Sequence, residues 1–264
     1  MSKDEKIKHG DIILLFYDER RNWIIRVEEE KEFHTHLGIV NLGSIVGKEW
    51  GSIVESSLRK KFYVFRPSIG DLIVKIPRRT NIIYPKDAGF ILLSAGIGPG
   101  SRVAEAGSGS GALASILAYY VRPTGHVYSY EVREDFIKLA KRNVKRLGLL
   151  DYVTFKNKDI KEGIDEGDLD AVILDLTTPW DYVKVAYDAL SAHGMFVSFS
   201  PTIDQVIKTY DALLKNGFRF MRCVESFLRD IIVRPGKTRP SSRMIGHTGY
   251  ILLARKVSKD EGTK

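Results

Sequence analysis

The pattern of apolar and polar positions changes near residue 88. Before that point, short apolar or alternating runs are separated by charged or glycine-containing turns, which is typical of a small antiparallel β domain. The runs are DIILLFY, NWIIRV, GIVNLGSIVG and KFYVFRP. We therefore predict a β domain over residues 1–68 and a connecting segment over residues 69–87.

From residue 88 onward, strand-like and helix-like runs alternate. The strand-like runs are RVAEA, GHVYSYE, YVTFK, LDAVILDL and GMFVSFS, and amphipathic runs such as REDFIKLAKRNVKRLG and TIDQVIKTYDALLKNG lie between them. This alternation predicts an α/β domain over residues 88–264 with a mostly parallel, doubly wound sheet. The runs FRFMRCVESFL and TGYILLARK have no helix between them. They predict an antiparallel pair of strands at one edge of that sheet.

Composition narrows the class of protein. The 264 residues are 44% hydrophobic and 28% charged, as in an ordinary soluble globular protein. No apolar run reaches the length of a membrane span, and the charged N-terminus has no apolar signal segment. A single cysteine, Cys223, excludes an intrachain disulfide framework and a cysteine-based metal cluster. Together these features predict a cytoplasmic protein.

The net charge of +8 suits a polyanionic partner such as nucleic acid, although generic surface charge explains it equally well. Residues 229–243 concentrate this charge, with five cations against the single acid Asp230. Their pattern fits an RNA-contacting patch or a solvated charged loop. The five cations are Arg229, Arg234, Lys237, Arg239 and Arg243.

A glycine-rich turn, EAGSGSGALA, follows the first strand of the second domain and opens a helix. Its glycines allow a sharp turn and close approach to a ligand, and the helix N-terminus favours an anionic group. The turn also satisfies G-x-G-x-x-A, so a nicotinamide cofactor is not excluded. The residues that we predict to line a cofactor site here are Gly107, Ser108, Gly109, Ser110 and Gly111.

Acidic residues stand at the ends of consecutive strands. Glu131 follows Gly111 by 20 positions, where an acid can accept hydrogen bonds from ribose hydroxyls. Asp159 lies just beyond the third strand, near where an adenine ring would lie. Glu105 precedes the glycine turn, where an acid can contact an ammonium group. Each acid alone fits a solvated cap, but together they favour S-adenosylmethionine (SAM), which has an ammonium group that NAD lacks.

The fourth strand ends in Asp175, within the sequence DLTTPW. The carboxylate either caps the helix that begins at Pro179 or faces the reacting atom beside the cofactor. The stretch resembles the Asp/Asn-Pro-Pro-aromatic loop of amino-directed methyltransferases, in which Trp180 would pack on the target base. His34 and His36 would share one face of a strand, but no further ligand completes a metal site, and we predict none.

The whole pattern resembles the tRNA (adenine-N1)-methyltransferase family, often called TrmI. The resemblance extends over nearly the whole chain and is most specific in three motifs. These motifs are YPKD (84–87), LDLTTPW (174–180) and GHTGY (246–250). It implies a small N-terminal β domain, a Rossmann-like class I SAM methyltransferase domain and a homotetramer. It also implies methylation of N1 of adenosine 58 in the tRNA T-loop, with position 57 as an additional target in some archaeal members.

The resemblance assigns roles to individual residues. The glycine turn would line the methionine part of SAM, Glu131 would hold the ribose, and Asp159 would hold the adenine. Asp175 would be the catalytic carboxylate, and Tyr84 would stand near the target base. Asn81 replaces a glutamine that is common in the family, so its shorter amide would reach the cofactor differently. The residues that would contact substrate or RNA are Tyr84, Trp180, Arg234, Arg239, Arg243 and His247.

Three other functions stay open from the sequence. A catalytically silent RNA-binding partner would not need to keep the glycine turn together with its acids. A SAM enzyme acting on a protein or a small molecule would not need the basic stretch. A nicotinamide dehydrogenase would bind NAD in place of SAM, which calorimetry distinguishes.

Overall fold

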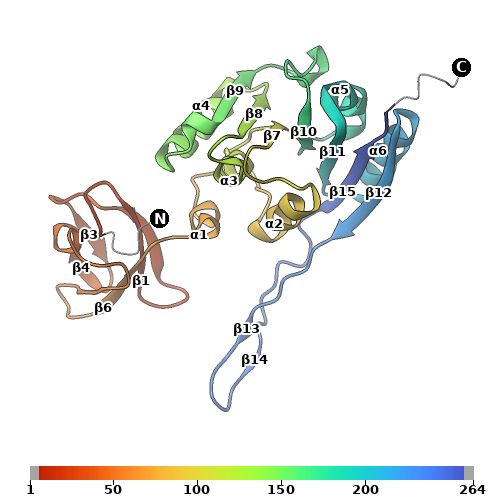
Figure 1. The fold of residues 1–264 in the computed structure, drawn as a ribbon. Coiled ribbons are helices and arrows are strands. Elements are labelled where there is room, and N and C mark those ends of the chain that lie inside the picture. Colours follow the sequence, from red (N-terminus) through yellow and green to blue (C-terminus); the bar gives the residue numbers. More distant parts are fainter. Residues whose placement is uncertain (1–5, 259–264) are drawn as a thin grey trace, which may run out of the picture. The chain divides into compact units, whose positions relative to one another are not determined.

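The computed structural model describes residues 6–258, and the chain divides into two compact units, residues 1–75 and 76–264 (Figure 1). The boundary falls inside the predicted connecting segment, residues 69–87. That segment contains a helix, α1 (Ile69–Val74), and the start of another, α2 (Pro85–Ser94). A capping box between Ser68 and Asp71 begins α1, which the sequence pattern did not predict.

The first unit is built from antiparallel strands. A four-stranded sheet has the order β2-β1-β6-β5, and β3 pairs separately with β4. Alternate residues of the central strands, including Ile13, Leu15, Phe62 and Val64, are fully buried in one core. The bounds are β1 Ile12–Phe16, β2 Asn22–Arg26, β3 Glu32–Thr35, β4 Gly38–Asn41, β5 Ile53–Glu55, β6 Lys61–Phe65 and the 3₁₀ turn η1 Gly43–Ile45. The predicted N-terminal β region is therefore confirmed, including a strand at His34 (β3), although β5 was not predicted.

The second unit is built on a seven-stranded sheet with the order β12-β15-β11-β10-β7-β8-β9 (Figure 1). Strands β7 to β11 are parallel, whereas β15 runs antiparallel to both of its neighbours, β11 and β12. The strand bounds are β7 Arg102–Ala106, β8 His126–Glu131, β9 Val153–Asn157, β10 Leu169–Leu174, β11 Leu190–Ser200, β12 Phe218–Glu225 and β15 Tyr250–Lys256. The predicted mostly parallel sheet with an antiparallel edge is confirmed.

Helices connect the parallel strands. Val172, Phe196 and Leu252 of the sheet share one buried cluster with Ala186 of α5 and Leu213 of α6. The remaining bounds are α3 Ala112–Val121, α4 Glu134–Arg146, α5 Val183–Ala189, α6 Ile203–Lys215, and the 3₁₀ turns η2 Leu150–Tyr152, η3 Ile160–Glu162 and η4 Pro179–Tyr182. The helix predicted over 179–190 is thus a 3₁₀ turn followed by a short α-helix.

A β-hairpin arm, residues 226–249, extends from the end of β12 before the chain returns as β15 (Figure 1). Its two short strands are β13 (Ile231–Ile232) and β14 (Arg239–Pro240), with Ile231 opposite Pro240. The sequence pattern predicted an irregular segment here. Proline and glycine reduce the pairing to two residues on each strand, which is too short for a periodic signal.

The chain order creates a switch point in the sheet. From β7 the chain continues through β8 and β9 on one side, whereas β10 and β11 lie on the other side. Crossover connections therefore leave in opposite directions between β7 and β10, and a crevice opens at the carboxyl ends of these two strands.

Candidate functional site

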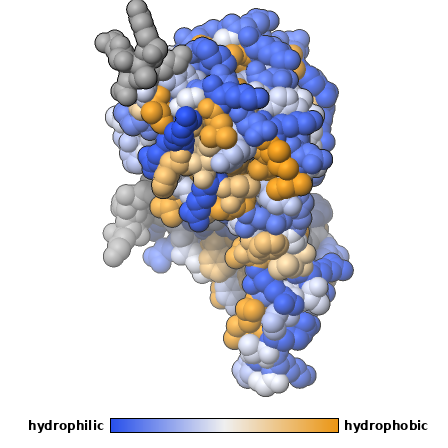
Figure 2. Space-filling model, turned by 90° about the vertical axis from the view of Figure 1, so that its right-hand side faces the viewer, coloured by the Kyte–Doolittle hydropathy of each residue, from blue (hydrophilic) through white to orange (hydrophobic). Residues whose placement is uncertain are grey.

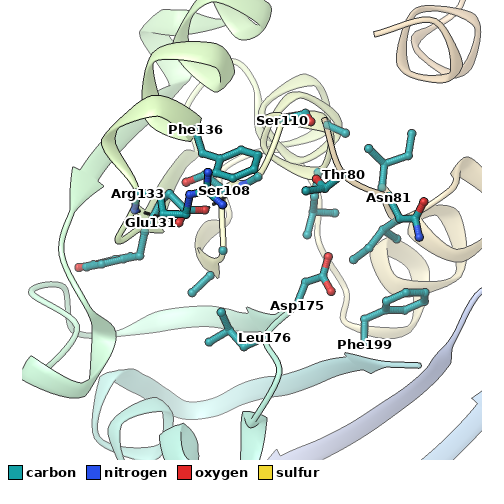
Figure 3. A pocket seen from close by; sticks show the side chains of 18 of the residues that line it. Thr80, Asn81, Ser108, Ser110, Glu131, Arg133, Phe136, Asp175, Leu176 and Phe199 are labelled. Atoms are coloured by element: carbon teal, nitrogen blue, oxygen red, sulfur yellow. Dashed lines mark hydrogen bonds between the residues drawn. The ribbon is translucent and has the colours of Figure 1, made fainter. Parts of the chain in front are cut away.

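A cavity of about 700 Å³ opens at the carboxyl ends of β7, β8 and β10. Its volume lies within the range of ~300–1,000 Å³ found for small-molecule sites. Glu131, Arg133 and Phe136 stand on one side, Thr80 and Asn81 stand on the other, and Asp175 lies between them (Figure 3). The cavity therefore occupies the position where open α/β sheets bind their ligands.

The glycine turn forms one part of the wall. The backbone N–H of Ser108 donates to the carbonyl of Tyr130 at 3.0 Å, and that of Gly109 donates to Oε2 of Glu131 at 3.2 Å. A Cβ atom on Gly107 would lie 3.1 Å from the same carboxylate oxygen. A side chain at this position would therefore crowd the carboxylate and enter the cavity. Gly107, Ser108, Gly109 and Ser110 all line the cavity, and their contact with a cofactor stays a prediction.

At position 111, a glycine is required for a different reason, which is the packing of two helices. Gly111 adopts φ +76°, and a Cβ atom would lie 2.9 Å from Cα of Ala140 in α4. The close packing of α3 on α4 therefore requires a glycine here. Gly111 does not belong to the lining of the cavity. Its neighbours Ser110 and Ala112 do line the cavity, and the predicted contact of Gly111 with a cofactor stays a prediction.

Glu105 lies behind the cavity wall and is 1% exposed. The Ser129 hydroxyl donates to its Oε1 at 2.6 Å, and the Ser129 and Ser108 hydroxyls lie 2.6 Å apart. Its Oε2 has no hydrogen-bond partner among residues 6–258. Burial, together with the neighbouring Asp175 and Glu131 carboxylates, raises the pKa of Glu105 to about 8. The side chain does not reach the cavity surface, so the predicted ammonium contact would require a rearrangement or a bridging group.

Glu131 and Asp159, the predicted partners of the ribose and the adenine, both line the cavity. The Arg133 backbone N–H donates to Oε1 of Glu131 at 3.1 Å, so each carboxylate oxygen is held by one backbone donor. Asp159 caps η3 by accepting from the Lys161 backbone N–H at 2.9 Å. The Arg133 guanidinium lies 4.3 Å from the centre of the Phe136 ring. This wall combines fixed acceptors with an aromatic face.

Asp175 follows β10 directly, and its backbone N–H donates to the carbonyl of Ala106 in the neighbouring strand at 2.6 Å. Its carboxylate points into the cavity (Figure 3). Solvent reaches it through the cavity, but protein atoms surround its other sides, and this desolvation raises its pKa to about 6. It does not cap η4, because Thr178 occupies that position without a side-chain hydrogen bond.

The wall opposite the glycine turn comes from two distant segments. Tyr84 is the N-cap residue of α2, and Asn81 precedes it along the same segment. His247 and Thr248 come from the end of the arm, just before β15. The structure therefore brings together the predicted residues Asn81, Tyr84 and His247 around the space above Asp175.

Both ring nitrogens of His247 face oxygen acceptors. Nδ1 lies 2.6 Å from Oε1 of Glu225, and Nε2 lies 2.9 Å from the carbonyl oxygen of Pro201. A neutral imidazole can donate from only one nitrogen, so this geometry favours the doubly protonated ring. The hydrogen bond to Glu225, followed by that to Pro201, raises the pKa of His247. Both ring nitrogens thus form hydrogen bonds within the protein, and the imidazole contributes to the cavity wall through its face and its carbon edges.

Other predicted substrate residues lie outside the cavity. Trp180 is absent from its lining and instead lies beneath the Lys208 ammonium, 4.9 Å from the ring centre. Tyr182, two residues further along η4, lines the cavity. The predicted stacking of Trp180 on the target base therefore has no support from the cavity lining and stays a prediction. The arginines Arg234, Arg239 and Arg243 are exposed on the arm and do not line the cavity.

For several residues that line the cavity, no sequence pattern predicts a place in a functional site. Phe136 reads as an ordinary apolar position of an amphipathic helix, and Phe199 reads as part of a buried strand. Thr248 was noticed only as a letter of the GHTGY motif. Within residues 6–258, no group of three or more His, Cys, Asp or Glu side chains is arranged to hold a metal ion. No helix in the same range is long and apolar enough to cross a membrane.

Comparison with known proteins places this geometry in context. Residues 61–238 match the family model described as "tRNA methyltransferase complex GCD14 subunit". The chain is 36% identical over 267 residues to the tRNA (adenine(57)-N(1)/adenine(58)-N(1))-methyltransferase TrmI of Methanocaldococcus jannaschii. That alignment covers 91% of this chain and 94% of the relative.

Two solved structures resemble the fold closely. A SAM-dependent O-methyltransferase from Thermotoga maritima superposes with a TM-score of 0.91 at 39% identity, covering 97% of this chain and 96% of the other. The tRNA (m1A58) methyltransferase TrmI from Aquifex aeolicus superposes with a TM-score of 0.85 at 28% identity, covering 97% and 100% of the two chains.

Proposed function

The chain belongs to the family of the tRNA methyltransferase complex GCD14 subunit, and we propose that it is a SAM-dependent tRNA (adenine-N1)-methyltransferase. The observation that carries this proposal is the position of Asp175. Its partly desolvated carboxylate lies at the end of β10, beside the glycine turn and Glu131, in a cavity large enough for a cofactor and a base.

The residues of one wall suit SAM. Glu131 offers two carboxylate oxygens that are fixed by backbone donors and can accept from ribose hydroxyls. Ser110 lines the cavity, and its buried hydroxyl has no partner among the described residues. Gly107 leaves room that a Cβ atom would fill. We assign the ribose to Glu131, the adenine to the region of Asp159 and Phe136, and the methionine part to the glycine turn.

When bound, SAM supplies a methyl group that its sulfonium already activates. The chain's own task is to hold adenine N1 in line with that group and to exclude water. The ionised Asp175 would accept a hydrogen bond from the exocyclic N6 amine, which orients the base. It would also stabilise the positive charge that develops on the ring as N1 is methylated.

The target base would enter from the side of Tyr84 and His247. N1 lies on the Watson–Crick edge, so the adenosine must leave its position in folded tRNA to reach Asp175. The Tyr84 ring, with the Arg78 guanidinium 5.9 Å from its centre, supplies an aromatic face there. We propose adenosine 58 as the target, with position 57 as a second target to be tested. The M. jannaschii relative is named for both positions.

The arm would contact tRNA phosphates. Arg234, Arg239 and Arg243 are exposed on a β-hairpin whose root carries His247 and Thr248 of the cavity wall. Phosphate contacts supply most of the affinity for RNA and little sequence information. Cations on an arm joined to the cavity rim would therefore orient the tRNA while Asp175 selects the base.

We also propose that the enzyme works as a homotetramer in the cytoplasm. Figure 2, which faces the side of α6 and β12, has apolar residues exposed among hydrophilic ones. Ile203, Ile207, Tyr210 and Leu214 of α6 are 40–54% exposed and recur at a 4-3-4 spacing, as in helix–helix seams. This stripe supports association with a second copy, and light scattering of the purified protein would test the number of subunits.

The experiment that tests the function is methyl transfer to an unmodified tRNA transcript. The RNA is digested after incubation with labelled SAM, and the nucleosides are identified by mass spectrometry. We expect 1-methyladenosine from the wild type. Asp175→Ala should transfer methyl groups at a rate that is lower by a factor of about one hundred or more, with SAM binding retained. Transcripts with guanosine at 57 or 58 separate the two target positions.

Other outcomes would support other functions. Binding of SAM and tRNA without transfer would support a catalytically silent subunit. The T. maritima structure is described as an O-methyltransferase, so 2′-O-methylated nucleosides would indicate that chemistry instead. Transfer to no RNA at all would overturn the proposed substrate.

A further inference from the structure

A closed polar network lies behind the wall that faces Asp175. The Lys86 ammonium donates three hydrogen bonds, to Asp87 Oδ1 at 2.7 Å, to the Ser226 carbonyl at 2.7 Å and to Thr248 Oγ1 at 2.6 Å. The Thr248 hydroxyl donates in turn to Asp87 Oδ2 at 2.8 Å. All three protons of the ammonium and the single proton of the hydroxyl are therefore used.

The network is withdrawn from solvent. The Lys86 and Asp87 side chains are 10% and 0% exposed. Their partners come from segments 140 and 162 residues further along the chain. A buried ion pair contributes little net stability compared with apolar side chains of the same volume, but it allows only one arrangement of its members.

Each member stands next to a residue with a place in the cavity or the arm. Lys86 and Asp87 lie in the first turn of α2, two and three residues after its N-cap Tyr84. Thr248 itself lines the cavity and follows His247. Ser226 is the first residue after β12, where the arm begins. The network thus ties the two motifs YPKD and GHTGY to each other and to the root of the arm.

We propose that Lys86, Asp87 and Thr248 are positioning residues for methyl transfer, because their network fixes Tyr84 and the 245–248 segment across the cavity from Asp175. This inference rests on the proposed function and deepens it. The target base must sit between Asp175 and this wall with its N1 in line with the transferred group. A shift of the wall by about 1 Å would misplace the base without disturbing the cofactor wall, which is built from other elements.

Thr248 offers the mildest test, because valine has the shape of threonine without its hydroxyl. Thr248→Val removes the donor to Asp87 and the acceptor for Lys86, whereas Thr248→Ser keeps both. Thr209→Val is the control for the same substitution elsewhere: Thr248 is partly buried and Thr209 is fully buried, and the Thr209 hydroxyl donates to the Gln205 carbonyl within α6 at 2.7 Å. All variants are compared in kcat and KM for the tRNA transcript, SAM affinity by calorimetry, and thermal unfolding.

We expect kcat of Thr248→Val to fall about tenfold or more, with SAM affinity within about twofold of wild type. Thr248→Ser should restore the rate, and Thr209→Val should leave it unchanged. Amide hydrogen exchange adds a readout that does not require transfer. Exchange over residues 244–250 should rise in Thr248→Val and not in Thr209→Val.

Two results would overturn the inference. One is an unchanged kcat in Thr248→Val. The other is a loss of rate matched by equal losses of SAM affinity and melting temperature, which would make the network part of the fold alone. If the wild type binds SAM but makes no 1-methyladenosine, the proposed function fails, and the positioning role falls with it. Exchange over 244–250 would still report whether the network restrains the segment.

Discussion

The backbone N–H of Gly109 donates a hydrogen bond of 3.2 Å to Oε2 of Glu131. This contact joins the glycine turn after β7 to the acid at the end of β8, two features that are 22 residues apart. The carboxylate is thereby held at a fixed distance from the turn. In the proposed SAM site, this one side chain would therefore organise both the ribose and the methionine parts.

Glu131→Ala should therefore weaken SAM binding by about ten- to a hundredfold, since hydrogen bonds to charged groups contribute about 1.5–3 kcal/mol each. Titration calorimetry measures this directly. Glu134→Ala is the control, because Glu134 lies nearby on α4 but pairs with Lys138 at the surface. Equal affinities of the two variants would remove Glu131 from the cofactor site.

Asp175 should reduce the stability of the folded protein at neutral pH. Its pKa is raised from 3.8 to about 6, so the native state favours the protonated form more than the unfolded state does. The free energy of unfolding should fall as the pH rises from about 4 to 6, and the ionised carboxylate destabilises the fold above that range. Asp175→Asn should then melt at a higher temperature than wild type at pH 8, with a smaller difference at pH 5. Asp181→Asn, at an exposed position in η4, is the control for the substitution itself.

The rate should depend on pH through two groups with opposite requirements. Asp175 must be ionised, so kcat/KM should rise through about pH 6. His247 must be doubly protonated to donate hydrogen bonds to both Glu225 and the Pro201 carbonyl. The positive charge of the nearby Lys86 acts against this protonation. The Tyr250 ring packs beside the imidazole. Since the hydrogen bond to Glu225 raises its pKa, its contribution to stability is complete below the unfolded pKa of about 6.5. That contribution is lost as the pH rises through the folded value.

A bell-shaped profile of kcat/KM should result. His247→Gln, which does not titrate, should flatten the alkaline limb and leave the acid limb in place. If the alkaline limb persists in this variant, the group responsible is not His247.

Much of the fold could be predicted because its signals are local. A strand ending in glycines before a helix, as at Ala106, identifies a βα unit from sequence alone. The arm was missed because its paired strands have two residues each. Acids at consecutive strand ends converge because parallel strands share one carboxyl edge, which is why Glu131, Asp159 and Asp175 were found together.

The remaining parts of the site depend on contacts that no local pattern encodes. Gly111 looks like a ligand-binding glycine, but its conformation serves the packing of α3 against Ala140. Trp180 and Tyr182 are two positions apart on a 3₁₀ turn, and only the turn's orientation decides which ring enters the cavity. Thr248 reaches Lys86 across 162 residues, a contact that depends on the completed sheet.

Glu105 provides a separate prediction about buried charge. Its pKa is raised from 4.5 to about 8, so the side chain is largely neutral at pH 7 and hydrogen-bonded to Ser129. Because the unfolded state ionises first, wild-type stability should decline between about pH 4.5 and 8, on the order of 1.4 kcal/mol for each pKa unit, and level off above. The free energy of unfolding of Glu105→Gln should not show this decline with pH. Thermal melts of both proteins across this range test it, and parallel curves would show that Glu105 is ionised in the native state.

The arm should govern tRNA affinity through its charge. Replacing Arg234, Arg239 and Arg243 together by alanine should weaken tRNA binding while SAM affinity stays unchanged, since none of them lines the cavity. Each phosphate contact that is lost should reduce the slope of log K against log salt concentration by about 0.7–0.9. If all three contact phosphates, the slope should become less steep by about 2–3.

Charge removal elsewhere provides the control for this experiment. Lys138, Lys141 and Arg142 are exposed cations on α4, and their triple alanine variant has the same net charge as the arm variant. A general electrostatic attraction would weaken both variants equally, because the chain carries a net charge of +8. A larger change in affinity and slope for the arm variant alone would assign the phosphate contacts to the arm. Equal changes would leave the arm without a specific role in holding tRNA.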